Sequence, residues 1–101
     1  MERGQIGSRR VIVAKSFIVR GRVQGVGFRY FAADVAERWG IRGYARNLPN
    51  GDVEVYAEGE KGAMFSFKEE LQQGPRMARV RELIEDDLTP TNSYSTFVIR
   101  G

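Results

Sequence analysis

Residues 21–29 read Gly-Arg-Val-Gln-Gly-Val-Gly-Phe-Arg, and they join two segments of different periodicity. Before them, residues 11–19 are rich in β-branched side chains, which is typical of a strand buried on both faces. After them, an apolar stripe of helical period runs from Phe28 to Trp39, which predicts an amphipathic helix that ends before Gly40. Three glycines in seven residues suit neither element, so the strand is expected to stop at Gly21 and a loop to follow.

The next segment along the chain predicts a hairpin. Residues 43–47 and 53–58 have strand patterns, and the Leu-Pro-Asn-Gly sequence at 48–51 is a strong turn signal between them. In the second of these strands, valines and an alanine alternate with polar residues. We therefore expect Val53 to face the core and Glu58 to face solvent.

A second helix and two further strands are predicted in the last third of the chain. Met64, Phe67 and Leu71 recur at helical spacing before a Gly-Pro stop at 74–75, with Phe65 off the stripe on a partly exposed flank. The three-residue spacing of Val80 and Leu83 fits a bulged strand or a helical turn, and its place in the pattern favours the strand. Residues 96–100 indicate a short final strand.

This order of elements is typical of the α+β class. It predicts the ferredoxin-like split βαβ arrangement (βαββαβ), in which an antiparallel sheet carries two helices on one face. Residues 11–101 are expected to form this domain and residues 1–10 a flexible N-terminal tail. The fold carries many unrelated functions, so the function must be argued from a site.

Composition removes several classes of mechanism. The chain of 101 residues contains no cysteine and no histidine, so thiolate nucleophiles, the usual neutral-pH base and the commonest zinc, haem and iron–sulfur ligands are absent. A net charge of +3 favours anionic partners. Lys15 and Arg20 interrupt the apolar N-terminal run, no signal peptide or membrane span is recognised, and a cytoplasmic location is expected.

The loop at 21–29 has the composition of an anion site. Glycines let successive backbone N–H groups converge, and the following helix adds the positive end of its dipole. Arg29 falls in the first helical turn, where a cation is unfavourable unless an anion binds beside it. The Gly-Lys-Ser/Thr end of a Walker A loop and the third glycine of a dinucleotide fingerprint are both missing.

Two motifs resemble those of the acylphosphatase family. Residues 21–29 are similar to its first signature, G-x-V-Q-G-V-x-F-R, and residues 43–54 to its second, G-[WY]-[AV]-x-N-x-x-[DN]-G-x-V-E. The resemblance spans about residues 15–101. Tyr44 stands where many members have tryptophan and Asn50 where many have aspartate, and neither change removes a group that the reaction needs.

The resemblance implies hydrolysis of acyl phosphates to a carboxylate and inorganic phosphate by in-line attack of water, without a metal or other cofactor. It implies that Arg29 and Asn47 are catalytic, Asn47 by orienting the water, and that the terminal carboxylate of Gly101 approaches Arg29. The phosphoryl oxygens would be held by Arg29 and by the backbone N–H groups of the loop, namely those of Gln24, Gly25, Val26, Gly27 and Phe28. Inorganic phosphate would then be both product and inhibitor.

Two alternatives lack hydrolase activity. One is an RNA-binding ferredoxin-like module, which would need aromatic residues on an exposed sheet face, whereas Glu54 and Glu58 flank Tyr56 there. The other is an acylphosphatase-like module of a larger carbamoyl-transfer machine, which is normally the front end of a much longer chain. We therefore expect a freestanding monomeric hydrolase that binds neither nucleic acid nor membrane.

Overall fold

The structure, a computed structural model, describes residues 10–101. The predicted tail at 1–10 thus lies outside the described residues, apart from Arg10. The described part contains five strands and two helices in the order β1 (Ile12–Arg22), α2 (Phe28–Trp39), β2 (Arg42–Asn47), β3 (Val53–Glu60), α3 (Lys61–Gln73), β4 (Arg79–Leu88) and β5 (Phe97–Arg100). This is the predicted order of elements, and the α+β, ferredoxin-like prediction is confirmed.

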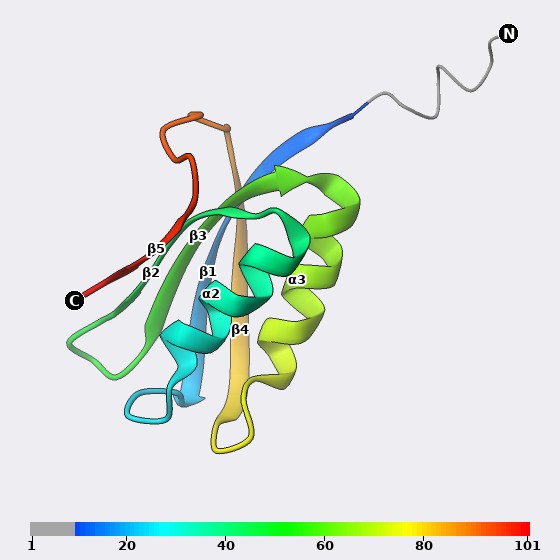
Figure 1. The fold of residues 1–101 in the computed structure, drawn as a ribbon. Coiled ribbons are helices and arrows are strands. Elements are labelled where there is room, and N and C mark those ends of the chain that lie inside the picture. The colour runs from blue at the N-terminus through cyan, green and yellow to red at the C-terminus, as the bar shows by residue number, and fades with distance from the viewer. Residues whose placement is uncertain (1–9) are drawn as a thin grey trace, which may run out of the picture.

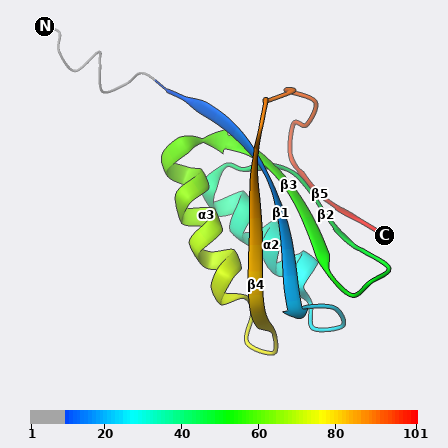
Figure 2. The same cartoon turned by 180° about the vertical axis from the view of Figure 1, so that it is seen from behind.

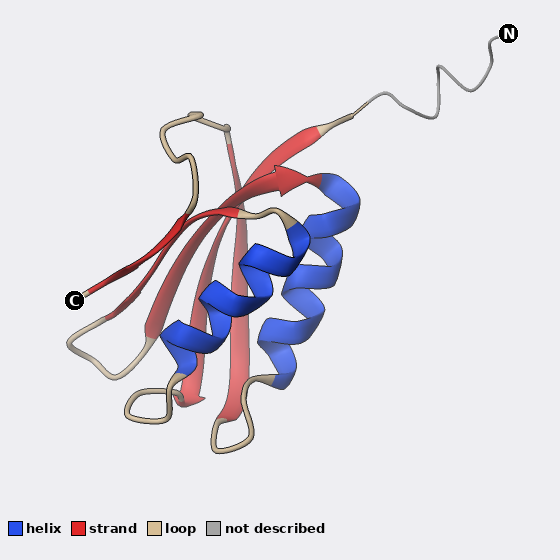
Figure 3. Ribbon diagram, viewed as in Figure 1, coloured by secondary structure: helices blue, strands red, loops and turns tan. Residues whose placement is uncertain are grey.

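Both helices lie on one face of a single sheet, as Figures 1 and 3 show. Figure 2 shows the other face, which neither of the described helices covers and which we call the open face. The strand order is β4-β1-β3-β2-β5, so β1 and β3 are central and β4 and β5 form the edges. Neither of the two described helices is long and apolar enough to cross a membrane.

The sheet is mixed, whereas the sequence led us to expect an antiparallel one. β1, β2, β3 and β4 pair antiparallel, but β5 pairs parallel to β2. The connection at 89–96 crosses from one edge of the sheet to the other and reverses the chain once. Since β2 already runs opposite to β4, this single reversal makes β5 parallel to β2.

The core lies between the helices and the sheet. Phe17 and Phe67 meet there with ring centroids 6.2 Å apart, and both side chains are fully buried. The predicted stripes face this layer through residues that the structure buries, namely Phe28, Ala32, Val35 and Ala36 of α2 and Met64, Phe67 and Leu71 of α3. Phe65 is 65% exposed, as its position off the stripe predicted.

Two residues differ from the sequence-based expectation. Trp39, at the end of the α2 stripe, is 39% exposed, and its Nε1 donates a hydrogen bond of 2.8 Å to Glu70 Oε2. Glu58, expected to face solvent, is fully buried because the connection at 89–96 folds over it on the open face. Burial of Glu58 depends on a segment more than thirty residues away, which strand alternation cannot reveal.

β1 delivers the chain to the loop through a bulge. The strand continues past its expected end at Gly21 to Arg22, and its pairing with β4 shifts register between Arg20 and Gly21. Gly21 has a φ of +130°, and a Cβ there would lie 2.0 Å from the carbonyl oxygen of Arg79. Only glycine fits this close approach, so the bulge fixes where the strand turns into the loop.

Candidate active site

Two left-handed glycines shape the loop between β1 and α2. Gly25 has a φ of +74° and Gly27 a φ of +77°, and open space surrounds both. Gly27 is also the N-cap residue of α2, and among the described residues no side chain caps this helix end. The first N–H groups of α2 therefore remain available to an anion, together with the positive end of the helix dipole.

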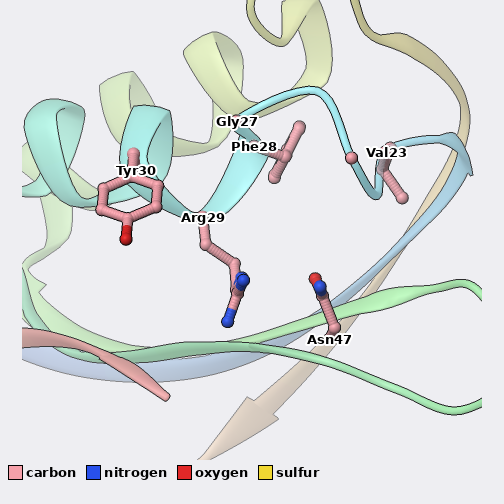
Figure 4. A pocket seen from close by; sticks show the side chains of 7 residues that line it. Val23, Gly27, Phe28, Arg29, Tyr30 and Asn47 are labelled. Carbon is pink, nitrogen blue, oxygen red and sulfur yellow. The ribbon is translucent and has the colours of Figure 1, made fainter. Parts of the chain in front are cut away.

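A small pocket of about 100 Å³ opens beside this loop. Its volume is well below the roughly 300–1,000 Å³ of typical ligand pockets, so it suits a compact group rather than a large molecule. Figure 4 shows the lining side chains, which come from the loop, the first turn of α2 and the end of β2. The lining residues are Val23, Gly25, Gly27, Phe28, Arg29, Tyr30 and Asn47.

Arg29 and Asn47 lie on opposite sides of the pocket. In Figure 4 the Arg29 side chain extends from α2 toward the sheet, and the Asn47 amide points from the end of β2 into the same space. Arg29 Nη1 also donates a hydrogen bond of 2.6 Å to the carbonyl oxygen of Arg100, at the end of β5. The guanidinium has five N–H donors, so this contact leaves others free for the pocket.

Gln24 connects the loop to the β2–β3 turn. Its Nε2 donates hydrogen bonds of 2.8 Å to the carbonyl oxygens of both Leu48 and Asp52. The turn is closed further by Asn50, whose Oδ1 accepts a 3.0 Å hydrogen bond from the backbone N–H of Asp52. Because Leu48 directly follows Asn47, the Gln24 side chain holds the two sides of the pocket together.

The structure brings five of the seven expected site residues to the pocket. Gly25, Gly27, Phe28, Arg29 and Asn47 line it. Gln24 and Val26 are outside the lining set. The Gln24 side chain turns to the β2–β3 turn, and Val26 packs partly buried against the core.

Two lining residues were missed by reasoning from the sequence. Val23 is buried at the base of the loop, and Tyr30 is 65% exposed at the mouth of the pocket. A signal for Tyr30 was present, because it follows Arg29 and falls off the apolar stripe of the helix. The contact of Arg29 with the Arg100 backbone has no signal in residue type: the carboxylate of Gly101 was expected near Arg29, and the structure places the Arg100 carbonyl oxygen there.

The pocket is electropositive by composition. Its lining contains one cation, Arg29, and no carboxylate. Within residues 10–101 no group of three or more histidine, cysteine, aspartate or glutamate side chains is placed to hold a metal ion. An anion-binding pocket formed by an arginine, loop amides and a neutral amide side chain suits phosphate chemistry.

Comparison with known proteins identifies the chain. A sequence model of the acylphosphatase family matches residues 15–99. The chain belongs to the acylphosphatase family. An acylphosphatase of Pasteurella multocida is 42% identical over 89 residues, which are 88% of this chain and 99% of that one. An acylphosphatase of Thermus thermophilus is 59% identical over 63 residues, 62% of this chain and 72% of the relative.

Solved acylphosphatase structures share the fold. The crystal structure of acylphosphatase from Bacillus subtilis superposes with a TM-score of 0.85 at 34% identity, covering 88% of this chain and 99% of that chain. Full-length HypF, solved in a phosphate- and nucleotide-bound form, superposes with a TM-score of 0.82 at 26% identity, and the match covers only 12% of that longer chain. Acylphosphatases hydrolyse acyl phosphates, and this chain is a hydrolase of that family.

Proposed function

We propose that the pocket beside residues 21–29 is the active site, with Arg29 and the loop amides binding the phosphoryl group of an acyl phosphate. The observation that carries this proposal is that Arg29 and Asn47, from α2 and β2, line one small pocket with Gly25 and Gly27. The phosphoryl oxygens would accept hydrogen bonds from the Arg29 guanidinium and from the N–H groups at the start of α2. These donors are held in place before substrate binds, which is the main requirement of phosphoryl transfer.

Asn47 orients the attacking water in this mechanism. Its amide can accept a hydrogen bond from the water and aim an oxygen lone pair at phosphorus, in line with the leaving acyl oxygen. The new P–O bond forms as the P–O bond to the acyl group breaks. A phosphoryl oxygen takes the water proton, and the bonding electrons leave with the carboxylate.

The reaction needs neither an acid nor a metal from the protein. A carboxylate is a weak base and leaves without protonation, so the absence of histidine and cysteine is consistent with the chemistry. Arg29 supplies the positive charge that a metal ion provides in other phosphoryl transfer enzymes. Inorganic phosphate, which has the shape and charge of the transferred group, acts as product and competitive inhibitor.

The enzyme is proposed to act as a cytoplasmic monomer without nucleic acid. The tyrosines on the open face support this against an RNA-binding role. Tyr44 and Tyr56 stack on each other, with centroids 5.9 Å apart and planes inclined by 21°, and Glu54 lies within hydrogen-bond distance of Tyr44. Rings that pack together beside a carboxylate are poorly placed to stack on the bases of a polyanion.

The test is an assay of benzoyl phosphate hydrolysis with phenyl phosphate as the control substrate. We expect turnover of benzoyl phosphate and little turnover of the ester, whose phenoxide leaving group is a much stronger base than benzoate. Competitive inhibition by inorganic phosphate is expected in the same assay. Equal rates on both substrates, or inhibition that is not competitive, would contradict the proposed site.

A further inference from the structure

Arg100 contacts Arg29 through its backbone and the open face of the sheet through its side chain. Its carbonyl oxygen accepts the 2.6 Å hydrogen bond from Nη1 of Arg29, which belongs to α2. Its side chain lies on the open face. Successive residues of a strand face opposite sides of the sheet, and the pair before Arg100 and Arg46 is Ile99 and Ala45. The side chain of Ala45 is buried on the helix side, so that of Arg100 faces the other way. One residue thus joins the pocket to the far side of the sheet.

On the open face the Arg100 guanidinium packs against aromatic rings. We call Tyr44, Tyr56 and Tyr94 the tyrosine cluster, since their ring centroids lie 5.7–5.9 Å apart. The Arg100 Cζ lies 4.2 Å from the centroid of the Tyr44 ring, which is cation–π distance. Arg100 Nη2 also donates a hydrogen bond of 2.9 Å to the Tyr94 hydroxyl.

The tyrosine cluster is itself anchored by the buried carboxylate of Glu58. The Tyr56 hydroxyl donates a hydrogen bond to Glu58. Glu58 Oε2 also accepts hydrogen bonds from the backbone N–H of Thr91, at 2.6 Å, and from its hydroxyl, at 2.9 Å. These bonds hold the connection at 89–96, which carries Tyr94, against the sheet.

The Arg29 guanidinium is oriented by the Arg100 carbonyl, and β5 holds this carbonyl only weakly. β5 has four residues and pairs with β2 alone, so few ladder hydrogen bonds fix the Arg100 carbonyl. Edge positions of this kind open locally at low free energy. Within residues 10–101, the Arg100 carbonyl is the one protein group that hydrogen-bonds to the Arg29 guanidinium.

We propose that Arg100 is a positioning residue for acyl phosphate hydrolysis. Its side chain, clamped between Tyr44 and Tyr94, fixes the carbonyl that orients the Arg29 guanidinium toward the phosphoryl group. The inference rests on the proposed role of Arg29. It extends the functional part of the molecule to the tyrosine cluster, on the face of the sheet that the pocket does not reach.

The experiment compares Arg100→Ala, Arg100→Lys and Tyr94→Phe with the wild type in the benzoyl phosphate assay. Arg100→Ala removes the clamp and keeps the carbonyl, so Arg29 becomes less well oriented. We expect kcat/KM to fall on the order of tenfold, through both a higher KM and a lower kcat. Lysine keeps the charge without the planar fork, and Tyr94→Phe keeps the ring without the acceptor, so both losses should be smaller.

A matched control is Arg81→Ala, which removes an exposed arginine from β4, the opposite edge strand. It should leave kcat and KM unchanged. Thermal unfolding is measured for every variant. The Arg29 Nε–H signal in ¹⁵N NMR is followed with and without inorganic phosphate. If Arg100 had a purely structural role, its replacement would not change the line width of this signal. In Arg100→Ala we expect this signal to broaden and to sharpen again when phosphate binds.

The outcomes separate the two proposals. Full activity of Arg29→Ala would overturn the proposed active site. A second outcome would overturn the positioning role alone. In it, Arg29→Ala is inactive, whereas Arg100→Ala and Tyr94→Phe are folded and keep the kcat, the KM and the Arg29 line width of the wild type. A loss in Arg100→Ala that follows only its lower melting temperature, with no change in the Arg29 signal, would also overturn it.

Discussion

The side-chain amide nitrogen of Gln24 lies 2.8 Å from the carbonyl oxygen of Leu48. This one hydrogen bond joins the glycine-rich loop to the residue that follows Asn47. A second bond of the same length, to Asp52, fixes the other side of the turn. The relative position of the loop amides and the Asn47 side chain is therefore set by contacts outside the pocket, and each side can be tested separately.

Asn47→Ala should lower kcat while inorganic phosphate still binds. In the proposed mechanism its amide contacts the water and not the phosphoryl group. Loss of one positioning group of this kind costs on the order of a hundredfold in rate, roughly 3 kcal/mol of barrier. Steady-state kinetics and phosphate calorimetry provide the measurements. Asn50→Ala is the matched control, because its hydrogen bonds stay within the turn and should affect stability more than turnover.

Arg29→Ala should weaken phosphate binding and turnover together, since in the proposed mechanism the guanidinium contacts the phosphoryl oxygens before and during reaction. Arg29→Lys should restore only part of the loss, because an ammonium cannot reproduce the planar fork. Arg22→Ala removes a charge from an exposed residue that is not in the pocket lining, and should have little effect. Equal phosphate affinity in wild type and Arg29→Ala would show that the anion binds elsewhere.

Removal of metal ions should leave activity intact. The lining supplies Arg29 and backbone amides and contains no carboxylate that could hold a divalent cation. The measurement is benzoyl phosphate turnover after dialysis against EDTA and in its continued presence. Activity that disappears on chelation and returns with Mg²⁺ would refute the proposed mechanism without a metal.

Glu58→Gln should destabilise the fold at pH 7, and by less at acidic pH. Burial by itself would raise the pKa of Glu58, but the hydrogen bonds from Tyr56, Thr91 and Asn92 outweigh it and lower the pKa below its ordinary value. The ionised carboxylate therefore contributes stability above the unfolded-state pKa of about 4.3, and that contribution is lost as the pH falls through the lower folded-state value.

The expected loss in Glu58→Gln is about 2 kcal/mol at neutral pH, the usual size for hydrogen bonds to a charged acceptor. Urea unfolding at pH 7 and pH 3 measures it. Glu69→Gln, at an exposed position of α3, is the control and should change stability by less than about 0.5 kcal/mol. A deficit in Glu58→Gln that is as large at pH 3 as at pH 7 would contradict the prediction.

Gly21→Ala and Gly62→Ala should change stability in opposite directions. At Gly21 a Cβ would meet the Arg79 carbonyl oxygen at 2.0 Å, in a left-handed conformation, which should cost about 3 kcal/mol or more. Gly62 lies in α3 with open space around it, so alanine there should stabilise by about 0.5–1 kcal/mol. Melting temperatures of both variants decide the matter, and a neutral Gly21→Ala would be inconsistent with the bulge.

Local patterns in the sequence were sufficient for the elements and their order. The stripe from Phe28 to Trp39 predicted α2 with its bounds, and the Asn-Gly turn predicted the hairpin of β2 and β3. The parallel pairing of β5 was not predictable, because strand direction depends on how the connection at 89–96 crosses the sheet. Burial of Glu58 depends on the same connection.

The candidate site was predictable to the extent that it is contiguous in sequence. Gly25, Gly27, Phe28 and Arg29 stand together in the loop and first helical turn, where composition alone indicated an anion site. Nothing in residue type distinguished Asn47 from an ordinary turn residue, and only the resemblance nominated it. The contacts of the Gln24 side chain and the Arg100 carbonyl are products of tertiary structure, which periodicity does not encode.

The strand order β4-β1-β3-β2-β5 also bears on how quickly the chain folds. Only β2 and β3 are joined by a tight turn. β1 must find β3 across a helix, a strand and a hairpin turn, and β4 across more than fifty residues of intervening chain. Each such pairing requires a long loop to close, and the entropy cost of closure precedes the stabilising contacts. Topologies of this kind therefore fold slowly for their size. Refolding should accordingly take far longer than the microseconds of a helical bundle of equal length, and the pocket, which needs α2, β2 and β5 together, should form only as the sheet is completed.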